Sequence, residues 1–97
     1  MMTSSISKLD LASGFHGMAT REAGDSALML MLKALDEADV LELDFGGQAP
    51  TPSFADQSLG NLAKHLGFDV FRQRVRLANV PESARNLIRH VVLKAAS

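Results

Sequence analysis

The chain has no cysteine, tryptophan or tyrosine, so phenylalanine is its only aromatic residue besides histidine. The lack of cysteine excludes disulfides, thiolate catalysis and cysteine-ligated metal sites. The longest apolar run, residues 27–32, is far too short to cross a bilayer, and no secretory signal pattern opens the sequence. We therefore expect a cytoplasmic protein that does not associate with a membrane.

The residues that are present suit one globular domain. The 97 residues allow one modest core, and we treat 1–97 as a single domain with a frayed start at 1–5. Charge is distributed unevenly: residues 1–48 hold three Lys/Arg and eight Asp/Glu, whereas residues 49–97 hold seven and three. We expect these charges to decorate two solvated faces. The alternative is a dipolar domain suited to oriented docking.

The stretch 40–67 organises the rest of the chain. Apolar residues alternate with acids over 40–45, which predicts a strand buried on at least one face. Gly46 and Gly47 should end this strand, because glycine adopts backbone φ values that other residues resist. Two prolines then stiffen the loop 46–52 by fixing φ and restricting the preceding residues.

A helix is predicted to follow this loop. We expect Ser53 to be its N-cap, Asp56 to act as the capping-box acid and Gly67 to end it. The end of the strand and the start of the helix should then share one edge of the domain, where α/β folds place their sites. The buried face of the helix is marked by apolar residues at spacings of four, three and four: Ala55, Leu59, Leu62 and Leu66.

The remaining segments extend this alternation of strands and helices. It predicts an α/β fold with a mainly parallel or mixed sheet of four to five strands and about three helices, in the order β-(β)-α-β-α-β-α. In chain order we expect a half-buried strand over 6–12, a short second strand over 15–19, a long helix capped by Thr20 or Asp25, a connector over 68–73, an edge strand over 74–80 and a final helix from Pro81.

Two clusters have both structural and functional interpretations. Met29, Leu30 and Met31 would form an adaptable binding surface if exposed, but at helical spacing we expect them to pack in the core. The arginines of residues 72–89 suggest a nucleic-acid patch. We predict no nucleic-acid partner, because no Tyr or Trp is available for stacking and the overall charge is not basic. The arginines at 72, 74 and 76 instead indicate a solvated strand edge that resists pairing.

The sequence offers little that suggests catalysis or metal binding. His16, His65 and His90 are widely spread and form no H-x-x-x-H pair, so we expect no metal and no cofactor. A nucleophile set of Ser53, Asp56 and His65 fails on geometry. His65 lies twelve residues along the same helix, roughly 18 Å from Ser53 at about 1.5 Å per residue. We predict no catalytic residues.

Three segments together resemble a known family. LELDFGG at 41–47, TPSFADQSLGNL at 51–62 and RVRLANV at 74–80, followed by a closing helix, are similar to compact, uncharacterised STAS-like domains with an LDF…SFAD core. The resemblance covers roughly residues 18–95. It implies a STAS-like fold related to the anti-sigma-factor antagonists, and a protein partner of the histidine-kinase ATPase type.

In those antagonists, phosphorylation of a hydroxyl residue in a D-S-[ST]-G turn controls docking. Set against that pattern, Pro52 stands at the Asp, Ser53 at the first hydroxyl, Phe54 at the phosphorylated position and Ala55 at the glycine. Ser53 is therefore the one phosphosite candidate that the resemblance offers. A phosphate there would meet a helix N-terminus, which favours it, and Asp56, which repels it.

We therefore interpret the chain as a non-enzymatic regulatory binding module. One alternative is a small-ligand-binding or catalytic domain that uses Asp44, Ser53 and Asp56 at the same edge. Another is a homodimer or larger scaffold formed through the Met/Leu helix or an exposed edge strand. Phe54 is either an anchor inserted into the partner or a core residue. The predicted contact residues are Gly46, Gly47, Ser53, Phe54, Asp56 and Gln57, with Arg21 as a secondary candidate.

Overall fold

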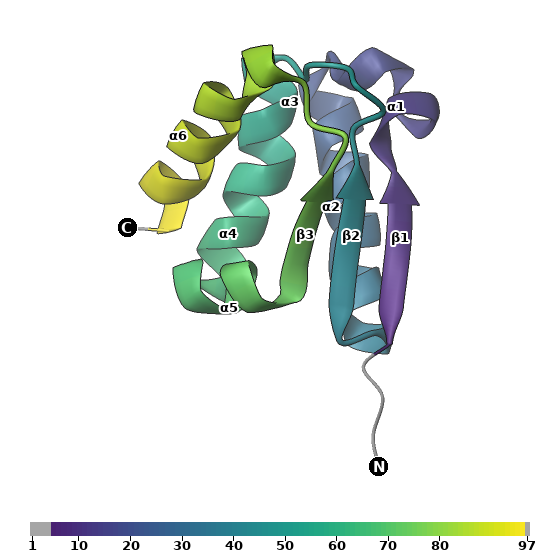
Figure 1. The fold of residues 1–97 in the computed structure, drawn as a ribbon, viewed down its shortest axis with the longest axis vertical. Coiled ribbons are helices and arrows are strands. Elements are labelled where there is room, and N and C mark those ends of the chain that lie inside the picture. The colour runs from purple at the N-terminus through teal and green to yellow at the C-terminus, as the bar shows by residue number, and fades with distance from the viewer. Residues whose placement is uncertain (1–4, 97) are drawn as a thin grey trace.

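A computed structural model of the protein describes residues 5–96, and within them three parallel strands form one sheet (Figure 1). The strands lie in chain order, with Leu9 beside Leu43 and Leu43 beside Leu77. Because β2 is central, it is paired on both sides and supplies the most deeply buried strand residues. The strands are β1 (Ile6–Asp10), β2 (Val40–Asp44) and β3 (Val75–Ala78).

Helices make up most of the rest of the described chain. The structure is α/β, but the predicted sheet of four to five strands with about three helices is wrong, because there are three strands and more helical segments. These are α1 (Leu11–Gly14), a 3-10 turn (His16–Met18), α2 (Arg21–Glu37), α3 (Pro52–Ala55), a π turn (Asp56–Gly60), α4 (Asn61–Leu66), α5 (Phe68–Arg74), a second 3-10 turn (Glu82–Ala84) and α6 (Arg85–Ala96).

Two expected elements account for this error. The predicted strand over 15–19 is a turn, because His16, Gly17 and Met18 all have positive φ, which an extended strand does not allow. The predicted connector over 68–73 is α5. Its first turn carries Asp69 and its last turn two arginines, and both placements favour the helix dipole.

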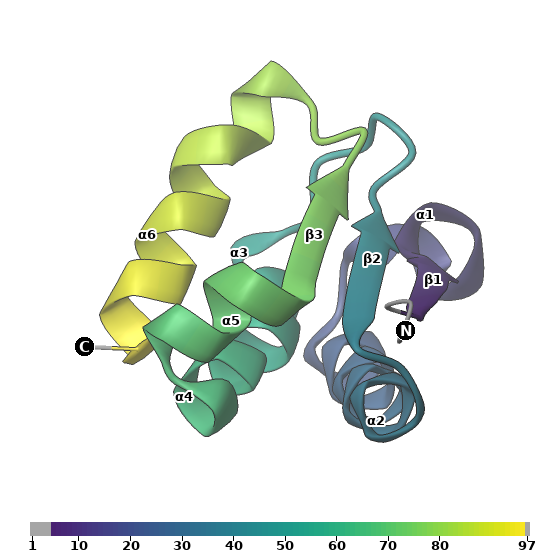
Figure 2. The ribbon, with the colours of Figure 1, turned by 60° about the horizontal axis from the view of Figure 1, so that its bottom comes forward.

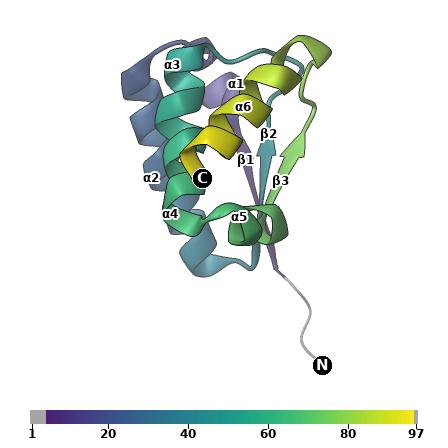
Figure 3. The same cartoon turned by 90° about the vertical axis from the view of Figure 1, so that its left-hand side faces the viewer.

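The helices α2, α3, α4 and α6 lie on one side of the sheet, and no element of residues 5–96 covers the other side (Figure 3). Strands in chain order joined by right-handed crossovers place both crossovers on the same face. A row of charges runs across the open face, where Glu42 neighbours Lys8 on one side and Arg76 on the other. Lys8 and Glu42 approach to 4.0 Å. A polar face of this kind tolerates water.

The core lies between the sheet and the helix layer. Leu41, Leu43 and Phe45 are fully buried, which confirms the predicted strand over 40–45. Residues 52–66 form one continuous helical segment with the π turn at its centre, and Gly67 ends it with φ +83° as predicted. On the predicted face, Ala55, Leu59 and Leu62 are fully buried and Leu66 is half-buried.

The Met/Leu cluster of α2 is divided between core and surface. Thr20 caps α2 by accepting the Ala23 amide at 3.0 Å, as one of the two predicted alternatives required. Met31 is fully buried, but the core prediction is wrong for Met29 and Leu30, which are 66% and 45% exposed. An exposed pair of large apolar side chains therefore remains on this helix.

Arg74 joins α5 to the end of α2. Its guanidinium donates to the carbonyl oxygens of Leu35, Ala38 and Asp39 at 2.6, 2.9 and 3.0 Å. The Leu35 carbonyl lies in the last turn of α2, where the end of a helix leaves carbonyls without partners, and Ala38 and Asp39 follow that turn. Arg74 is therefore not the solvated edge residue that we predicted.

The beginning of the described chain is also attached to this corner. The Ser5 amide donates to the Asp39 carboxylate at 3.1 Å, and its hydroxyl accepts the Asp39 amide at 3.1 Å. The Ser5 carbonyl in turn accepts the Val40 amide at 3.0 Å. Of the segment 1–5, for which a frayed start was predicted, Ser5 is thus hydrogen-bonded at this corner, and residues 1–4 lie outside the described part of the chain.

Replacing Arg74 by lysine is expected to lower the free energy of unfolding by about 1–3 kcal/mol, because an ammonium cannot reproduce the fork that bonds three carbonyls. Chemical denaturation of the purified chain measures this. The matched control is Arg72→Lys, since within residues 5–96 Arg72 stacks over the Phe68 ring at 5.6 Å and donates no hydrogen bond to a carbonyl. Equal losses for the two variants would contradict the role given to Arg74.

Candidate functional site

The loop 46–52 begins with a tight turn. Gly46 and Gly47 have φ values of +58° and +75°, and the Gln48 amide closes the turn on the Phe45 carbonyl at 2.9 Å. The Gly47 amide then donates to the carbonyl of Asn79 at 2.8 Å. The predicted reason for the two glycines is therefore confirmed, and the turn is tied to the segment that follows β3.

Asp44 holds the same two segments together. Its Oδ1 accepts the Gly46 amide at 2.8 Å and the Asn79 side-chain amide at 2.9 Å. Asn79 has φ +54°, a conformation that asparagine tolerates better than most residues. Asp44 is thus a structural residue at the carboxyl ends of β2 and β3, and it does not line the cavity that contains Ser53.

Asp10 has a similar role at the end of β1. Its carboxylate accepts the Ser13 hydroxyl at 2.7 Å and the amides of Ser13 and Ala12. The hydrogen bond from the Ser13 side chain, followed by that from its amide, lowers the pKa of Asp10 below its ordinary value. The carboxylate thereby caps α1.

Thr51, and not Ser53, caps the helix after the loop. The Thr51 hydroxyl accepts the Phe54 amide at 3.2 Å and donates to the Ala19 carbonyl at 2.8 Å, while the Thr51 amide donates to Met18 at 3.0 Å. Pro52 occupies the first helical position, which requires no amide hydrogen. The pair Thr51-Pro52 indicates this cap in the sequence, because proline favours the first helical position. The prediction of Ser53 as the cap did not use that indication.

Phe54 lies in the core. Its side chain is fully buried, and its ring centroid is 6.3 Å from that of Phe15. It is therefore not presented to a partner, and of the two interpretations offered for it, the core role is correct. The capping-box role of Asp56 is wrong as well, since the helix begins earlier and Asp56 lies at the start of the π turn.

Gln57 faces α2. Its side-chain oxygen accepts from Arg21 at 3.0 Å, and its amide donates to Asp25 at 3.3 Å. The two helices come this close because of Gly24, where an added Cβ would lie 3.0 Å from both the Gln57 Cβ and the Phe54 carbonyl oxygen. Arg21 Nη1 also lies 4.0 Å from an Asp56 carboxylate oxygen. The secondary candidate Arg21 is thus joined to the predicted site.

Ser53 is exposed beside an open depression between the start of the helix 52–66 and α6. The depression has a volume of about 320 Å³, and a second one of about 390 Å³ continues it along α6. We call the two together the Ser53 groove. Its polar and charged lining residues are Arg21, Ser53, Asp56, Asn61, Lys64, His90 and Lys94, and Leu87 and Val91 supply much of its apolar floor.

The structure therefore brings Arg21, Ser53 and Asp56 together, without Asp44. It adds His90 and Lys94, which sequence reasoning missed because nothing in the local pattern of α6 places that helix beside Ser53. Gly46 and Gly47 shape the loop but do not line the groove. Basic side chains outnumber the single carboxylate of Asp56.

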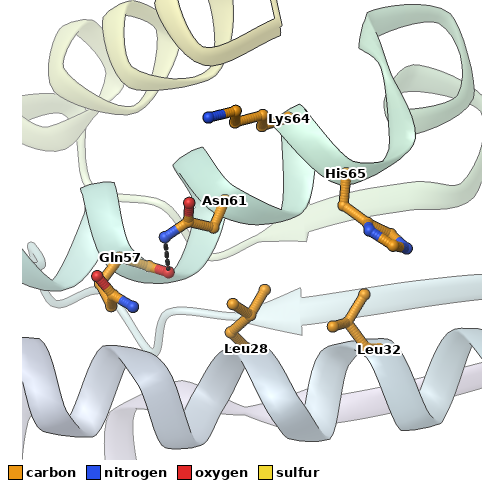
Figure 4. Close-up of a pocket in the computed structure, with 6 residues that line it drawn as sticks. All are labelled: Leu28, Leu32, Gln57, Asn61, Lys64 and His65. Atoms are coloured by element: carbon orange, nitrogen blue, oxygen red, sulfur yellow. Dashed lines mark hydrogen bonds between the residues drawn. The ribbon is translucent and has the colours of Figure 1, made fainter.

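A different cavity lies on the other side of the same helix, between α2 and α4 (Figure 4). It has a volume of about 540 Å³, and Leu28 and Leu32 reach into it from α2. His65 lines this cavity and not the Ser53 groove, as the geometric argument against a Ser53–His65 pair required. The Asn61 amide donates to the Gln57 carbonyl at 2.9 Å and so satisfies an acceptor within the π turn.

The described residues contain no group of three or more His, Asp or Glu side chains that could hold a metal ion. None of the helices in residues 5–96 is long and apolar enough to span a membrane. No family model, no curated protein and no solved structure matches the chain. The fold and the site together define a small α/β domain with one open sheet face and a predominantly basic groove at the start of its central helix.

The Thr51 cap can be tested with a pair of hydroxyl deletions. Thr51→Val should lower the free energy of unfolding by about 1–2 kcal/mol, because it removes the cap and the bond to Ala19. Ser53→Ala should change it by less than about 0.5 kcal/mol, since Ser53 is exposed and its hydroxyl makes no hydrogen bond in the described structure. Thermal or urea unfolding measures both, and the reverse order would restore Ser53 as the cap.

The two loop glycines form a second matched pair. Gly46→Ala should lower the free energy of unfolding by about 2–4 kcal/mol, because the positive φ is combined with a new Cβ only 2.7 Å from that of Ala12. Gly47→Ala should lower the free energy of unfolding by about 1 kcal/mol, since its added Cβ meets nothing within 4 Å and only the backbone is strained. Equal costs in denaturant titrations would show that the contact with Ala12 is absent.

Proposed function

We propose that the chain is a non-enzymatic regulatory module that docks a protein partner through the Ser53 groove. The main support is that Ser53 is exposed on a helix start that Thr51 holds against a separate segment of the chain. Rigid surfaces lose less entropy on binding than mobile ones do. The apolar floor and polar rim of the groove also resemble the arrangement typical of interfaces.

A catalytic use of the same edge has less support. Asp44 is engaged by the Gly46 and Asn79 amides and lies outside the groove. His90 lines the groove together with Ser53, but no hydrogen bond joins their side chains within residues 5–96. A serine nucleophile needs a base within hydrogen-bond reach to become reactive. The groove therefore favours binding over acyl or phosphoryl transfer.

The chemistry of the groove indicates what kind of partner fits it. Arg21, Lys64, His90 and Lys94 line it, against the one carboxylate of Asp56. An acidic segment of the partner would be attracted and oriented by such a surface. The resemblance to STAS-like domains suggests a histidine-kinase-type ATPase as the first partner to test, and both this partner and a role for Ser53 phosphorylation stay predictions.

Two tryptophan substitutions test the docking site. Ser53→Trp should fill the groove and weaken capture of the natural partner at least tenfold while the fold survives, because Ser53 is exposed. Capture is measured by affinity purification from the source cells with quantitative mass spectrometry, and then by titration with the purified partner.

The control is Lys8→Trp on the open sheet face, where the side chain is 75% exposed. This variant should capture the partner as the unmodified chain does. An undiminished yield with Ser53→Trp, or an equal loss with Lys8→Trp, would show that the partner does not use the Ser53 groove. Phe54→Ala is unsuitable for this purpose because truncating a fully buried phenylalanine destabilises the fold itself.

A further inference from the structure

The large apolar side chains that the fold leaves exposed gather mainly on two surfaces. Within the described residues, one group lies on α2 and the other where α5, β3 and α6 meet. Scattered exposed apolar residues are common, but grouped ones indicate a surface that another molecule covers. The exposed residues are Met29 and Leu30 on α2, and Phe68, Val70, Leu77 and Leu93 around β3, with Ile6 on β1 apart from both.

The second of these surfaces contains a depression of about 300 Å³ between α5, β3 and α6, which we call the β3–α6 groove. Phe68, Leu77 and Leu93 line it and are 36%, 37% and 42% exposed. Behind them the buried side chains of Ile88 and Val92 form its floor. The groove lies beside β3, an outermost strand of the sheet, and an open strand edge is a frequent site of association.

The rim of the β3–α6 groove is basic. Arg89 lines the groove, and Arg72 stacks over the ring of Phe68 at its entrance. Arg85 lies one turn before Arg89 on α6, where it lines a neighbouring depression and pairs with Glu82 at 3.6 Å. Two copies of this groove facing each other would bring arginine against arginine, which disfavours a symmetric contact.

The exposed face of α2 carries the opposite charge. Met29 and Leu30 lie in the middle of this face, which we call the α2 ridge. Four exposed acids lie before and after this pair, against the two exposed bases Arg21 and Lys33. The ridge therefore offers an apolar centre with a net acidic surround, as the groove requires. The four acids are Glu22, Asp25, Asp36 and Glu37.

The ridge and the groove are placed so that both can be used at once. In the helix layer α4 packs between α2 and α6, so α2 and α6 lie on opposite flanks of the domain (Figure 2). A contact between unlike surfaces on opposite flanks is heterologous. Such contacts either close into a ring or form an open chain that leaves one ridge and one groove free at its two ends.

We propose that the chain assembles head to tail, with the α2 ridge of one copy seated in the β3–α6 groove of the next. Met29 and Leu30 pack on Leu77 and Leu93, and acids of the ridge face Arg89. The β3–α6 groove shares no lining residue with the Ser53 groove. On α2, the only residue that lines the Ser53 groove is Arg21, at the first position of that helix. The assembly therefore does not depend on the function proposed above.

Light scattering coupled to size-exclusion chromatography tests this with the full chain. The weight-average mass should rise with protein concentration to at least twice that of the monomer, and added salt should lower it because the contact is partly ionic. Leu93→Glu and Met29→Lys should each give monomers. An equimolar mixture of the two variants should form a dimer, because one chain keeps its ridge and the other its groove.

Ile6→Lys is the matched control, since Ile6 is 46% exposed but belongs to neither surface, and it should assemble normally. If Leu93→Glu or Met29→Lys fails to fold by circular dichroism, the charge pair Arg89→Glu and Glu37→Lys replaces them, with the same expected rescue on mixing. A chain that is monomeric at every concentration overturns the proposal. A mixture that stays monomeric, or a Met29→Lys chain that still dimerises alone, would also overturn it.

Discussion

The hydrogen bonds of Thr51 are the interactions on which the rest of the site depends. They join the start of the central helix to the carbonyls of Met18 and Ala19, more than thirty residues earlier in the chain. The turn that supplies these carbonyls is left-handed at three successive residues, which costs free energy at His16 and Met18 because neither is glycine. Full burial of Met18 and the bonds from Thr51 offset that cost.

This attachment fixes the direction in which the helix leaves the sheet. Phe54 then falls in the core against Phe15, while Ser53 and Asp56 face α6. Gly24 lets α2 approach the same helix closely enough for Arg21 to bond to Gln57. The groove is therefore a consequence of backbone geometry at a few positions, and its side chains are held before any partner arrives.

Much of this architecture could be predicted from local patterns. Alternation located the strands near 6–12, 40–45 and 74–80, and helical spacing together with Gly67 located the central helix. The cap was predicted at Ser53 because serine is also a preferred N-cap residue, although Pro52 at the first helical position marks Thr51 as the cap. The left-handed turn at 16–18 could not be predicted, since it depends on a contact with Thr51, and the place of His90 beside Ser53 likewise exists only in three dimensions.

The uneven distribution of charge along the sequence also has a counterpart in three dimensions. We expected the acids of the first half and the bases of the second half to decorate solvated faces. In the structure, the exposed acids of α2 and the arginines of α6 belong to helices on opposite flanks of the helix layer, whereas Arg74 of α5 reaches the end of α2. These two groups of charges are thus separated in space as well as in sequence, which suits oriented association with another molecule.

Amide hydrogen exchange at Thr51 and Phe54 tests the central claim most directly. If Thr51 fixes the helix start, both amides exchange as slowly as those of β2, because they open only when the domain unfolds. Exchange of these two amides at the rate of an unprotected loop, while β2 stays protected, would show that the helix start is mobile. The groove beside Ser53 would then not be preformed.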